Sequence, residues 1–509
     1  MNICILNGSY EESDAPTKDF DPLPDPAPYL PGHHCERHMI RKVTAVRQVR
    51  DLVRRGFDVF INLCDGAWDE DRPGIEVVQA LERYGAAFTG AGATFYEPTR
   101  EMMKFVCHYW DVPTPAYTFV METGHLEVAT RHLRFPLIVK HPNSYNSIGL
   151  TRASRVESLE ELYHQVSLMI EQFGGALIEE FIEGREFTVL VVENPEDELN
   201  PVAYTPVEFC FPAGESFKHF DLKWIDYAGM TCVPCTDPVL VHRLQEMSKK
   251  LFVGLNGNGY GRCDIRMNAQ GELFMLEINP NCSIFYPPQE AGSADFILLQ
   301  QPDGHKDFAD KMLKAALNRK AKSVKKWKIF LHPDSGFGMY AQTEIAAGEI
   351  IEPYEEKAHY LVTKTHVMKN WDAVKQEWFA QYAYPITAEV WATWSDQPGD
   401  WKPINHSCDP NAWLEGLNMV ARRPIARGEQ ITMDYATFCA DFMQPFECQC
   451  SAPDCRGVIQ GSDYLGEFVE RYGAHVSDYV RTKRQQLGIQ TNGRHLDIEL
   501  DEHYQMIGD

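Results

Sequence analysis

The chain carries two short runs, Gly261-Arg-Cys-Asp-Ile-Arg266 and Leu273-Phe-Met-Leu-Glu-Ile-Asn279, that predict a β-hairpin around a polar turn. Side chains two positions apart on a strand point to the same face. One face of the hairpin should therefore carry Arg262, Asp264, Glu277 and Asn279. This group suits one or two Mg2+ ions and a polyphosphate, because Mg2+ takes hard oxygen ligands and shares them with phosphates. A solvated surface hairpin is the alternative, and the apolar residues on both sides of each carboxylate argue against it.

Upstream of the hairpin, a lysine and a polar loop add phosphate-binding chemistry. Lys140 ends the apolar strand expected over 136–140, and the Ser/Asn/Gly-rich loop 142–149 can wrap phosphates with backbone N–H groups. The strand expected over 176–180 and the run 183–188 can offer backbone groups to adenine and a carboxylate to ribose. Together with the hairpin, these features predict a nucleotide site.

In this order the motifs resemble the ATP-grasp fold, closest to the D-alanine–D-alanine ligases, over roughly residues 1–300. The resemblance implies that the ATP phosphates are bound by Lys104, Lys140 and, in the run Phe220–Trp224, Lys223. It places Glu179 at the adenine end and Glu186 on the ribose hydroxyls. It assigns Mg2+ to Asp264, Glu277 and Asn279. Arg262 would stabilise the charge that develops during phosphoryl transfer and at the tetrahedral intermediate.

The reaction that this resemblance implies makes an acyl-phosphate from a carboxylate and ATP, and an amine then attacks it. Two departures concern the acceptor side. The run Pro280-Asn-Cys-Ser-Ile-Phe-Tyr286 replaces the small-residue run that cradles the second amino acid in these ligases. The run Asn7-Gly-Ser-Tyr-Glu-Glu12 replaces their glycine-rich N-terminal loop, and Glu11 or Glu12 could bind a substrate amine there. These differences predict a product other than D-alanyl-D-alanine.

A second set of motifs lies in the last third of the chain. The runs Asn405-His-Ser-Cys-Asp-Pro-Asn411 and Gly428-Glu-Gln-Ile-Thr-Met-Asp-Tyr435 follow Ser335-Gly-Phe-Gly-Met-Tyr340, whose two glycines let a cofactor approach the backbone closely. The set resembles the SET domain of lysine methyltransferases over roughly residues 328–460. The resemblance implies that S-adenosylmethionine is bound by Gly336, Gly338, Asn405 and His406, with Tyr435 as the catalytic tyrosine. Candidate walls of the cofactor or lysine channel are Phe438, Phe446, Tyr382 and Tyr384.

The cysteines near the C-terminal end predict a closed structural zinc site, which takes four thiolates. Three lie in the spacing Cys448-x-Cys450-x4-Cys455, and the resemblance to SET proteins supplies Cys408 as the fourth. Zinc there would pin the post-SET segment over the cofactor and lysine channel, whereas four unrelated thiols are the alternative. Cys439 is expected to be no ligand. A further metal-like group in an expected Pro-rich loop is interpreted as binding no metal; it comprises His33, His34, Cys35 and His38.

Composition limits the classes of protein. The 509 residues predict two to four domains, and 44% hydrophobic residues allow full cores. The net charge of −25 argues against a direct nucleic-acid partner; it is compatible with basic peptides or with solubility alone. The 14 cysteines include dispersed single ones, such as Cys4, Cys64 and Cys107, which predict a reduced, cytoplasmic protein, and a nuclear location stays open for a histone-type substrate. With no apolar run of about 18 residues, no membrane span is expected.

These features predict a multidomain α+β protein. Its N-terminal part is an ATP-grasp fold, with an α/β subdomain followed by two α+β ATP-binding subdomains; its C-terminal part is a mainly-β SET domain with a pseudoknot and a post-SET segment. The expected divisions are 1–95 and 96–300 for the ATP-grasp parts, 301–328 for a helical basic linker, 329–445 for the SET domain, 446–460 for the zinc segment and 461–509 for a helix and tail.

Three functions remain open from the sequence. The first is a bifunctional enzyme, which ligates a small carboxylate or amino acid to an amine and methylates an amine, such as a protein or peptide lysine. The second keeps the methyltransferase and makes the ATP-grasp half a non-catalytic, ATP-binding regulator. The third is a tailoring enzyme for a small molecule or peptide. The near-complete catalytic sets argue against a non-enzymatic scaffold, and the oligomeric state stays open.

Overall fold

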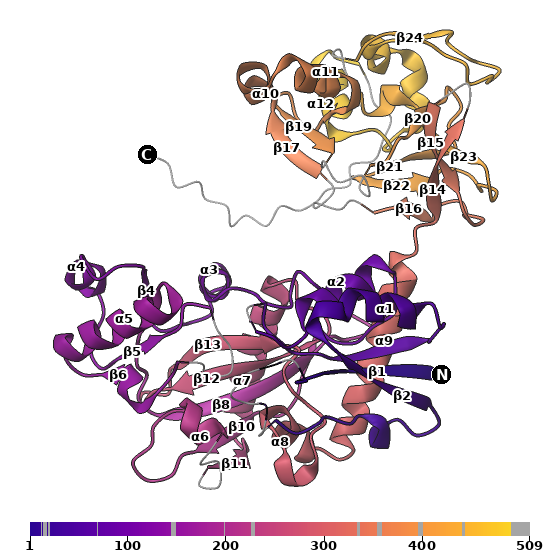
Figure 1. Cartoon of the computed structure of the whole chain (residues 1–509). Coiled ribbons are helices and arrows are strands. Elements are labelled where there is room, and N and C mark those ends of the chain that lie inside the picture. The colour runs from indigo at the N-terminus through magenta and orange to yellow at the C-terminus, as the bar shows by residue number, and fades with distance from the viewer. Residues whose placement is uncertain are drawn as a thin grey trace. The chain divides into compact units, whose positions relative to one another are not determined.

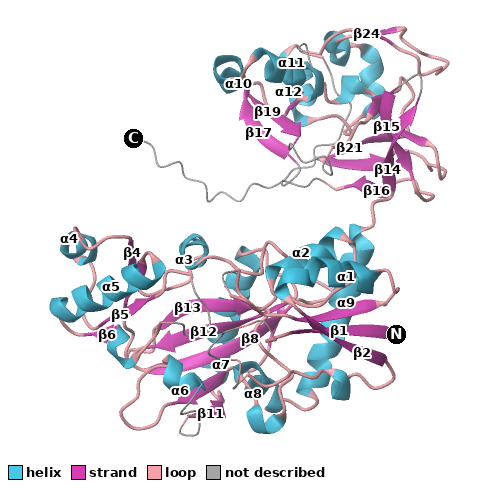
Figure 2. Cartoon of the chain, viewed as in Figure 1, coloured by secondary structure: helices cyan, strands magenta, loops and turns pink. Residues whose placement is uncertain are grey.

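The computed structural model describes residues 1–489 apart from 12, 14–17, 19–20, 69, 144–148, 198, 225–229, 333–335, 354–358, 395–400 and 440–442. The chain divides into two compact units, Met1–Ser323 and Val324–Asp509 (Figures 1 and 2). Among the helices that the described residues form, none combines the length and the apolarity needed to cross a membrane.

The first unit begins with a parallel sheet of strand order β2-β1-β3, from β1 (Asn2–Gly8), β2 (His34–Ile40) and β3 (Val59–Leu63). The middle of β1 and all of β3 are buried, as in parallel sheets that are covered on both faces. The amphipathic helices α1 (Ala45–Val53) and α2 (Ile75–Arg83) contribute to the core that covers this sheet.

The run that contains His33 to His38 differs from the loop expected there. Residues His34–Ile40 form β2, which pairs in parallel register with β1, Asn2 opposite His34. The expectation of a loop was wrong because β2 is an edge strand with little burial, and its polar side chains hide the alternating pattern of a strand.

Two further sheets complete the first unit. A small sheet of order β4-β7-β5-β6 comprises β4 (Tyr117–Val120), β5 (Leu137–Lys140), β6 (Arg155–Val156) and β7 (Ala176–Glu180), with helices α4 (Leu126–Thr130) and α5 (Leu159–Phe173). The largest sheet has the order β11-β10-β8-β12-β13, with β9 paired to β8; its strands are β8 (Arg185–Val192), β9 (Val202–Ala203), β10 (Val207–Cys210), β11 (Thr231–Pro234), β12 (Tyr260–Met267) and β13 (Leu273–Pro280). Helices α3 (Arg100–Tyr109), α6 (Phe220–Trp224), α7 (Pro238–Gly254) and α8 (Ser293–Leu299) belong to the same unit.

The last helix of the first unit replaces the linker expected over 301–328. Helix α9 spans Gly304–Ser323, and its buried side chains, among them Phe308 and Met312, belong to the core beside β1 and β3. The unit boundary falls after Ser323. Of the basic residues expected in the linker, Lys320 and Lys322 lie in the last turn of α9, where cations interact favourably with the helix dipole, and Lys325, Lys326 and Lys328 follow the helix.

The second unit consists mainly of short strands. One sheet has the order β14-β15-β23-β20, from β14 (Trp327–His332), β15 (Gly336–Ala341), β20 (Asn405–His406) and β23 (Gln430–Met433). The others are β16-β22-β21, β17-β19-β18 and β24-β25, formed by β16 (Ile350–Glu352), β17 (His359–Thr363), β18 (Tyr384–Pro385), β19 (Val390–Trp394), β21 (Ala412–Glu415), β22 (Asn418–Ala421), β24 (Phe446–Glu447) and β25 (Val458–Ile459). Its helices are α10 (Lys364–Asn370), α11 (Ala373–Tyr382) and α12 (Asp478–Gln486).

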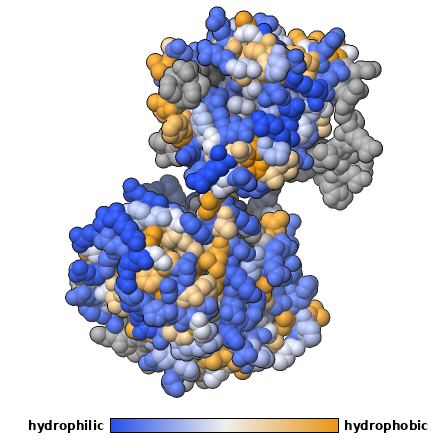
Figure 3. Space-filling model, turned by 90° about the vertical axis from the view of Figure 1, so that its right-hand side faces the viewer, coloured by the Kyte–Doolittle hydropathy of each residue, from blue (hydrophilic) through white to orange (hydrophobic). Residues whose placement is uncertain are grey.

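Hydrophilic side chains cover most of the face of each unit that Figure 3 shows, and apolar residues form smaller groups between them. In the SET-like region Trp391 is 5% exposed and packs with Phe379 and Val367, whereas Tyr382 is 37% exposed.

Candidate active sites and metal centre

The β12–β13 hairpin brings the four predicted polar side chains together. The antiparallel register places Arg262 opposite Asn279 and Asp264 opposite Glu277. Arg262 Nη2 donates to Asp264 Oδ2 at 3.0 Å. Asn279 Nδ2 lies 3.5 Å from the same oxygen and 3.3 Å from Glu277 Oε1. Both carboxylates and the amide oxygen of Asn279 are thus within one small volume.

The donor set fits a divalent cation that prefers oxygen. Asp264 is 7% exposed, and its Oδ1 accepts no hydrogen bond from the part of the chain that is described. Burial would raise the pKa of Asp264, but Arg262 and Lys218 hold it well below its ordinary value. Burial would likewise raise the pKa of Glu277. That pKa is nevertheless lowered, chiefly by Arg100, whose Nη1 lies 2.7 Å from Glu277 Oε2. Both groups are therefore anionic at neutral pH, as Mg2+ ligands must be.

Two lysines converge on one buried carboxylate in the small sheet. Glu179 on β7 is 1% exposed and pairs with β5, so that Lys140 Nζ reaches Glu179 Oε2 at 2.6 Å. Lys104, on α3, forms an ion pair with the other carboxylate oxygen of Glu179 and donates to Thr114 Oγ1 at 2.5 Å. Burial would raise the pKa of Glu179, and the two ammonium groups instead hold it far below its usual range. Lys104 is 2% exposed, and burial lowers its pKa.

The side chain of the predicted third lysine is not described, but another lysine close to it in the sequence reaches the cleft. Lys223 lies in α6, but its side chain is outside the described residues. Lys218 is the lysine whose Nζ lies 3.2 Å from Glu186 Oε1 and 3.9 Å from Asp264 Oδ1. Glu186 also accepts from Arg266 Nη1 at 3.3 Å. Most of the phosphate loop, residues 144–148, likewise lies outside the described residues.

One cleft connects these groups within the first unit. It has a volume of about 950 Å3 and is lined by both the hairpin and the small sheet, including Lys140, Glu186, Arg262, Asp264 and Glu277. Phe181, Phe217 and Ile138 add apolar walls. Cationic, anionic and apolar walls of this kind suit a nucleoside polyphosphate with its metal. Lys104 lies behind Glu179 and does not line the cleft.

In the second unit, an aromatic cluster surrounds Tyr435. Its hydroxyl donates to the backbone oxygen of Ile404 at 2.8 Å, and its backbone N–H donates to His406 Nδ1 at 3.2 Å. The ring centroids of Phe438 and Phe446 lie 5.6 and 5.9 Å from that of Tyr435. Burial raises the pKa of Tyr435, so its hydroxyl stays neutral at physiological pH.

The other predicted aromatic residues differ in their distance from this cluster. The ring of Tyr384 lies 6.0 Å from that of Phe438, whereas Tyr382, 37% exposed, contacts Trp378 at 5.9 Å. The rings of His406, Phe438 and Phe446 contact that of Tyr435 directly, Tyr384 contacts Phe438, and Tyr382 lies near enough to contribute to the raised pKa of Tyr435.

The residues expected to hold S-adenosylmethionine lie on adjacent strands. β20 carries Asn405 and His406 and pairs in parallel with β23, and β15 carries Gly336 and Gly338 on the other side of β23. Asn405 Nδ2 donates to the backbone oxygen of Phe337 at 3.1 Å. A Cβ at Gly338 would lie 2.9 Å from Asn405 Nδ2 and 2.4 Å from Gln430 Nε2, so glycine is what allows this approach.

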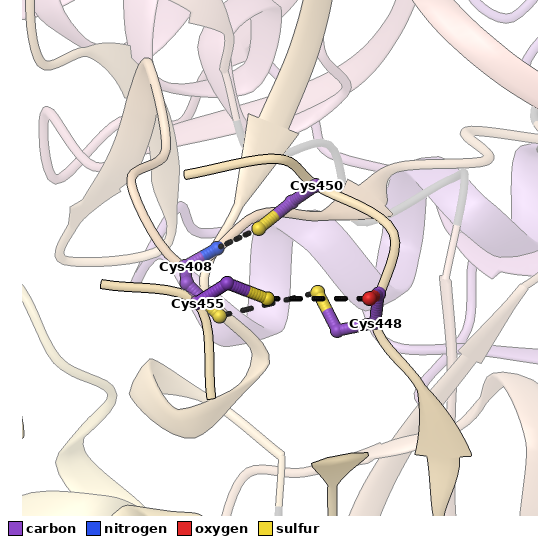
Figure 4. A group of neighbouring side chains, drawn as sticks. All are labelled: Cys408, Cys448, Cys450 and Cys455. Carbon is purple, nitrogen blue, oxygen red and sulfur yellow. Dashed lines mark hydrogen bonds between the residues drawn. The ribbon is translucent and has the colours of Figure 1, made fainter. Parts of the chain in front are cut away.

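The four predicted zinc ligands form one cluster (Figure 4). The Sγ atoms of Cys408, Cys448, Cys450 and Cys455 all lie within 4.8 Å of one another. The 3.9 Å between Cys408 Sγ and Cys448 Sγ is close to the edge of a tetrahedron with Zn–S bonds of about 2.3 Å. Burial acts to raise the pKa of Cys450, but N–H donors from Cys408 and Ala452 help bring it down to about 6. The donor chemistry and the spacing fit zinc, and Cys439 stands outside the cluster.

The comparisons with known proteins follow this division into units. Residues 107–284 match the family model described as "D-ala D-ala ligase C-terminus", and residues 336–436 match the one described as "SET domain". The D-alanine–D-alanine ligase of Mannheimia succiniciproducens is 30% identical over 240 residues, which are 45% of this chain and 73% of that protein. The chain belongs to the D-alanine–D-alanine ligase family.

Other relatives match a similar length of this chain. The D-alanine–D-alanine ligase of Hydrogenovibrio crunogenus is 28% identical over 240 residues, covering 47% of this chain and 72% of its own. A solved D-alanine–D-alanine ligase from Bacillus anthracis, complexed with ATP, has a TM-score of 0.46 at 16% identity and covers 64% of this chain and 100% of its own. The family assignment confirms the expected ATP-grasp fold in the first unit, and the second match confirms the SET domain.

Several residues of these sites were missed from the sequence. Arg100 and Lys218 form ion pairs with the predicted metal ligands Glu277 and Asp264, from α3 and from a loop, and no local pattern marks either of them. Arg266 could have been found, because it continues the face of Arg262 and Asp264 along β12.

The SET domain also contains a buried ion pair that was not predicted from the sequence. Asp434 is 1% exposed and accepts from Arg456 Nη1 and Nη2 at 2.8 and 2.7 Å and from Tyr472 at 2.8 Å. Burial would raise the pKa of Asp434, which Arg456 lowers. This ion pair attaches the zinc segment to the residue that precedes Tyr435.

Proposed function

We propose that the chain is an enzyme with two sites: an ATP-dependent carboxylate–amine ligase in the first unit and an S-adenosylmethionine-dependent methyltransferase in the SET domain. The methyl acceptor is an amine, such as a protein or peptide lysine. The observation that supports the ligase is the single cleft shared by Lys140, Glu186, Arg262, Asp264 and Glu277. For the methyltransferase it is the aromatic cluster around Tyr435 beside the Asn405–His406 strand.

The ligase reaction has two steps. A substrate carboxylate oxygen attacks the γ-phosphorus of ATP, the bond to the β-phosphate oxygen breaks, and ADP leaves. The amine nitrogen then attacks the acyl carbon and loses a proton, while the C–O bond to phosphate breaks. Catalysis of this type rests mainly on positioning and on neutralising charge.

The residues of the first unit divide this work. Lys140 provides a cation for the phosphates at the cleft wall, whereas Lys104 pairs with Glu179 behind it. Arg262 lines the cleft from β12 and would stabilise charge that develops at the transferred phosphoryl group. Asp264, Glu277 and Asn279 would hold Mg2+, which shields the phosphate oxygens when bound. Glu186, held by Arg266 and Lys218, presents a carboxylate for the ribose hydroxyls.

The SET domain would transfer a methyl group from the sulfonium of S-adenosylmethionine to an amine. Because the hydroxyl of Tyr435 donates to Ile404, its oxygen lone pairs are available to the reacting centre. The neighbouring rings of Phe438 and Phe446 suit positively charged methyl donors and lysines through cation–π attraction. A zinc ion held by the four cysteines would fix the segment after Phe446 and take no part in the chemistry.

The test uses the purified chain with methyl-labelled S-adenosylmethionine, ATP, Mg2+ and a cell extract, and then separates macromolecules from small molecules. Label in protein that Tyr435→Phe loses and Tyr109→Phe keeps supports a protein lysine methyltransferase; Tyr109 is the control because it is 78% exposed in the other unit. Label confined to small molecules supports a tailoring enzyme. No label that depends on Tyr435 contradicts the methyltransferase.

The ligase half is tested by ADP release across a panel of amino acids and amines. Acceptor-dependent ADP release that Asp264→Asn abolishes supports ligation. ATP binding without any acceptor-dependent release would contradict the ligase and favour an ATP-binding regulatory role for this unit.

A further inference from the structure

A second cavity of about 800 Å3 lies in the first unit, beyond the carboxyl ends of β1 and β3. Ligands of open α/β sheets bind at this edge. Its walls include the run 281–284, which departs from the family pattern, and Asn279 of the ATP cleft lies only two residues before it. The cavity is therefore placed to hold a substrate that reaches the ATP cleft.

The charge of this cavity is negative. Among the residues that the structure describes, Asp21 and Asp65 line it together with one cation, Arg72. The guanidinium of Arg72 is shared: Nη1 lies 2.8 Å from Asp65 Oδ1 and 3.7 Å from Asp21 Oδ2, and Nη2 lies 2.8 Å from Glu70 Oε2. One positive charge thus faces three carboxylates. Burial and the neighbouring Asp65 raise the pKa of Asp21, as expected for a carboxylate that lacks a full counter-charge.

The side chains around Asp21 hold it in place. The hydroxyls of Tyr10 and Tyr286 both donate to its carboxylate, one to each oxygen. Ser283 Oγ donates to Asp65 Oδ2 at 2.6 Å. Tyr286 and Ser283 belong to the run that differs from the ligase pattern, so these hydrogen bonds are features of this chain.

The side-chain oxygen of Asn7 is a buried acceptor at this cavity. Asn7 is 1% exposed and lines the cavity; its Nδ2 donates to the backbone oxygen of Pro24 at 3.0 Å, while its Oδ1 meets no donor within the described ranges. Buried polar atoms are nearly always hydrogen-bonded, so this oxygen indicates a ligand that donates. The apolar side chains of Leu23, Leu63 and Ile284 provide a wall for an aliphatic stem.

We propose that this cavity binds the side-chain ammonium group of a diamino acid, which makes a basic amino acid one of the two substrates that the first unit joins. The ammonium group supplies donors for Asp21, Asp65 and Asn7 and the missing positive charge. Its methylene stem lies along the apolar wall. This inference rests on the proposed ligase function but concerns binding, which can be measured without turnover.

The test compares ligands of the same size with and without the charge. Ornithine and norleucine have side chains of four heavy atoms, and only ornithine carries an ammonium; both enantiomers of each are titrated calorimetrically into the full-length chain with a non-hydrolysable ATP analogue. We expect ornithine to bind about tenfold or more tighter than norleucine, because hydrogen bonds to a charged group are among the stronger ones. Asp21→Asn and, independently, Asp65→Asn should each remove most of this preference, whereas Asp310→Asn, an exposed carboxylate on α9, should keep it.

The outcomes separate the two proposals. Equal or absent binding of ornithine and norleucine, or an undiminished preference in both folded variants, overturns the cavity assignment. An ornithine preference that depends on Asp21, without acceptor-dependent ADP release, supports the cavity and contradicts the ligase. Release of ADP that ornithine or lysine stimulates and norleucine does not supports both.

Discussion

Replacing Glu179 with glutamine should destabilise the first unit strongly, although the side chain keeps its shape. In the wild type the Glu179 carboxylate lies between Lys104 and Lys140. The glutamine removes the negative charge and leaves both ammonium groups. Lys140 is 13% exposed at the cleft wall and can turn towards solvent, whereas Lys104 is only 2% exposed and cannot.

The expected loss of stability depends on how the folded variant accommodates the buried ammonium group of Lys104. Removing one partner of a buried ion pair lowers the free energy of unfolding by about 3–5 kcal/mol, because the other charge stays buried without a counter-charge. An upper limit comes from letting Lys104 lose its proton: shifting a pKa of about 10.4 to 7 costs about 4.6 kcal/mol at 1.36 kcal/mol per unit. The two values agree, and at roughly 2 °C per kcal/mol for a large domain they predict a fall of about 6–10 °C in the unfolding midpoint.

The stability difference between Glu179→Gln and the wild type should also depend on pH. Because the pKa of Lys104 is lowered in the folded chain, the deficit of the variant should shrink as pH rises from 7 towards about 10.4. The depressed pKa of Glu179 gives the wild type a stability that is present above about pH 4.3 and lost as pH falls further, so the deficit should shrink there too.

Differential scanning calorimetry of the full chain measures this, with the transition of the first unit assigned by its shift with ATP. Glu171→Gln is the matched control, because Glu171 is exposed on α5 of the same unit. A shift of Glu179→Gln below about 2 °C, or one no larger than that of the control, would refute the reasoning. An excess of ATP should stabilise the variant more than the wild type, since phosphates would replace the lost charge.

Three further changes have expected outcomes. Asp264→Asn should reduce Mg2+-dependent ADP release by about 10²-fold or more, and undiminished release would contradict its role as a ligand. Cys455→Ser should lower bound zinc, measured by mass spectrometry, from one ion per chain towards none; retention of zinc would contradict the four-cysteine site. Asp434→Asn should destabilise the SET domain by about 2–4 kcal/mol, less than a fully buried pair because Arg456 is 16% exposed, and an unchanged SET-domain transition would contradict the ion-pair assignment.

Local patterns in the sequence predicted the hairpin and the zinc cysteines because their geometry is set within a few residues. Strand alternation places Asp264 near Arg262, and a short turn places both near Glu277. The spacing of Cys448, Cys450 and Cys455 likewise limits where their thiols can lie. The family resemblance added Cys408, which is distant along the chain and joins the cluster in space.

The parts that sequence reasoning missed depend on contacts between distant segments. The ion pair of Lys104 and Glu179 joins a helix to a strand 75 positions later, and that of Asp21 and Arg72 joins two loops. The basic run up to Lys328 favours a linker over 301–328, and the buried face of α9 becomes visible only when β1 and β3 are placed beside it. Burial that is created by tertiary packing has no local signature.

The predicted zinc site and Tyr435, the predicted catalytic tyrosine, are connected by a short physical path in the SET domain. Cys455 is followed directly by Arg456, which binds Asp434 in a bidentate manner, and Asp434 is followed directly by Tyr435. Cys408, two residues after His406, attaches the same zinc cluster to the strand proposed to hold the cofactor. Loss of zinc should therefore loosen both the tyrosine and the cofactor strand at once, and methyl transfer should fall while ADP release by the other unit stays unchanged. The coupling needs no long-range pathway, because every link in it is either a covalent neighbour or a bond shorter than 3 Å.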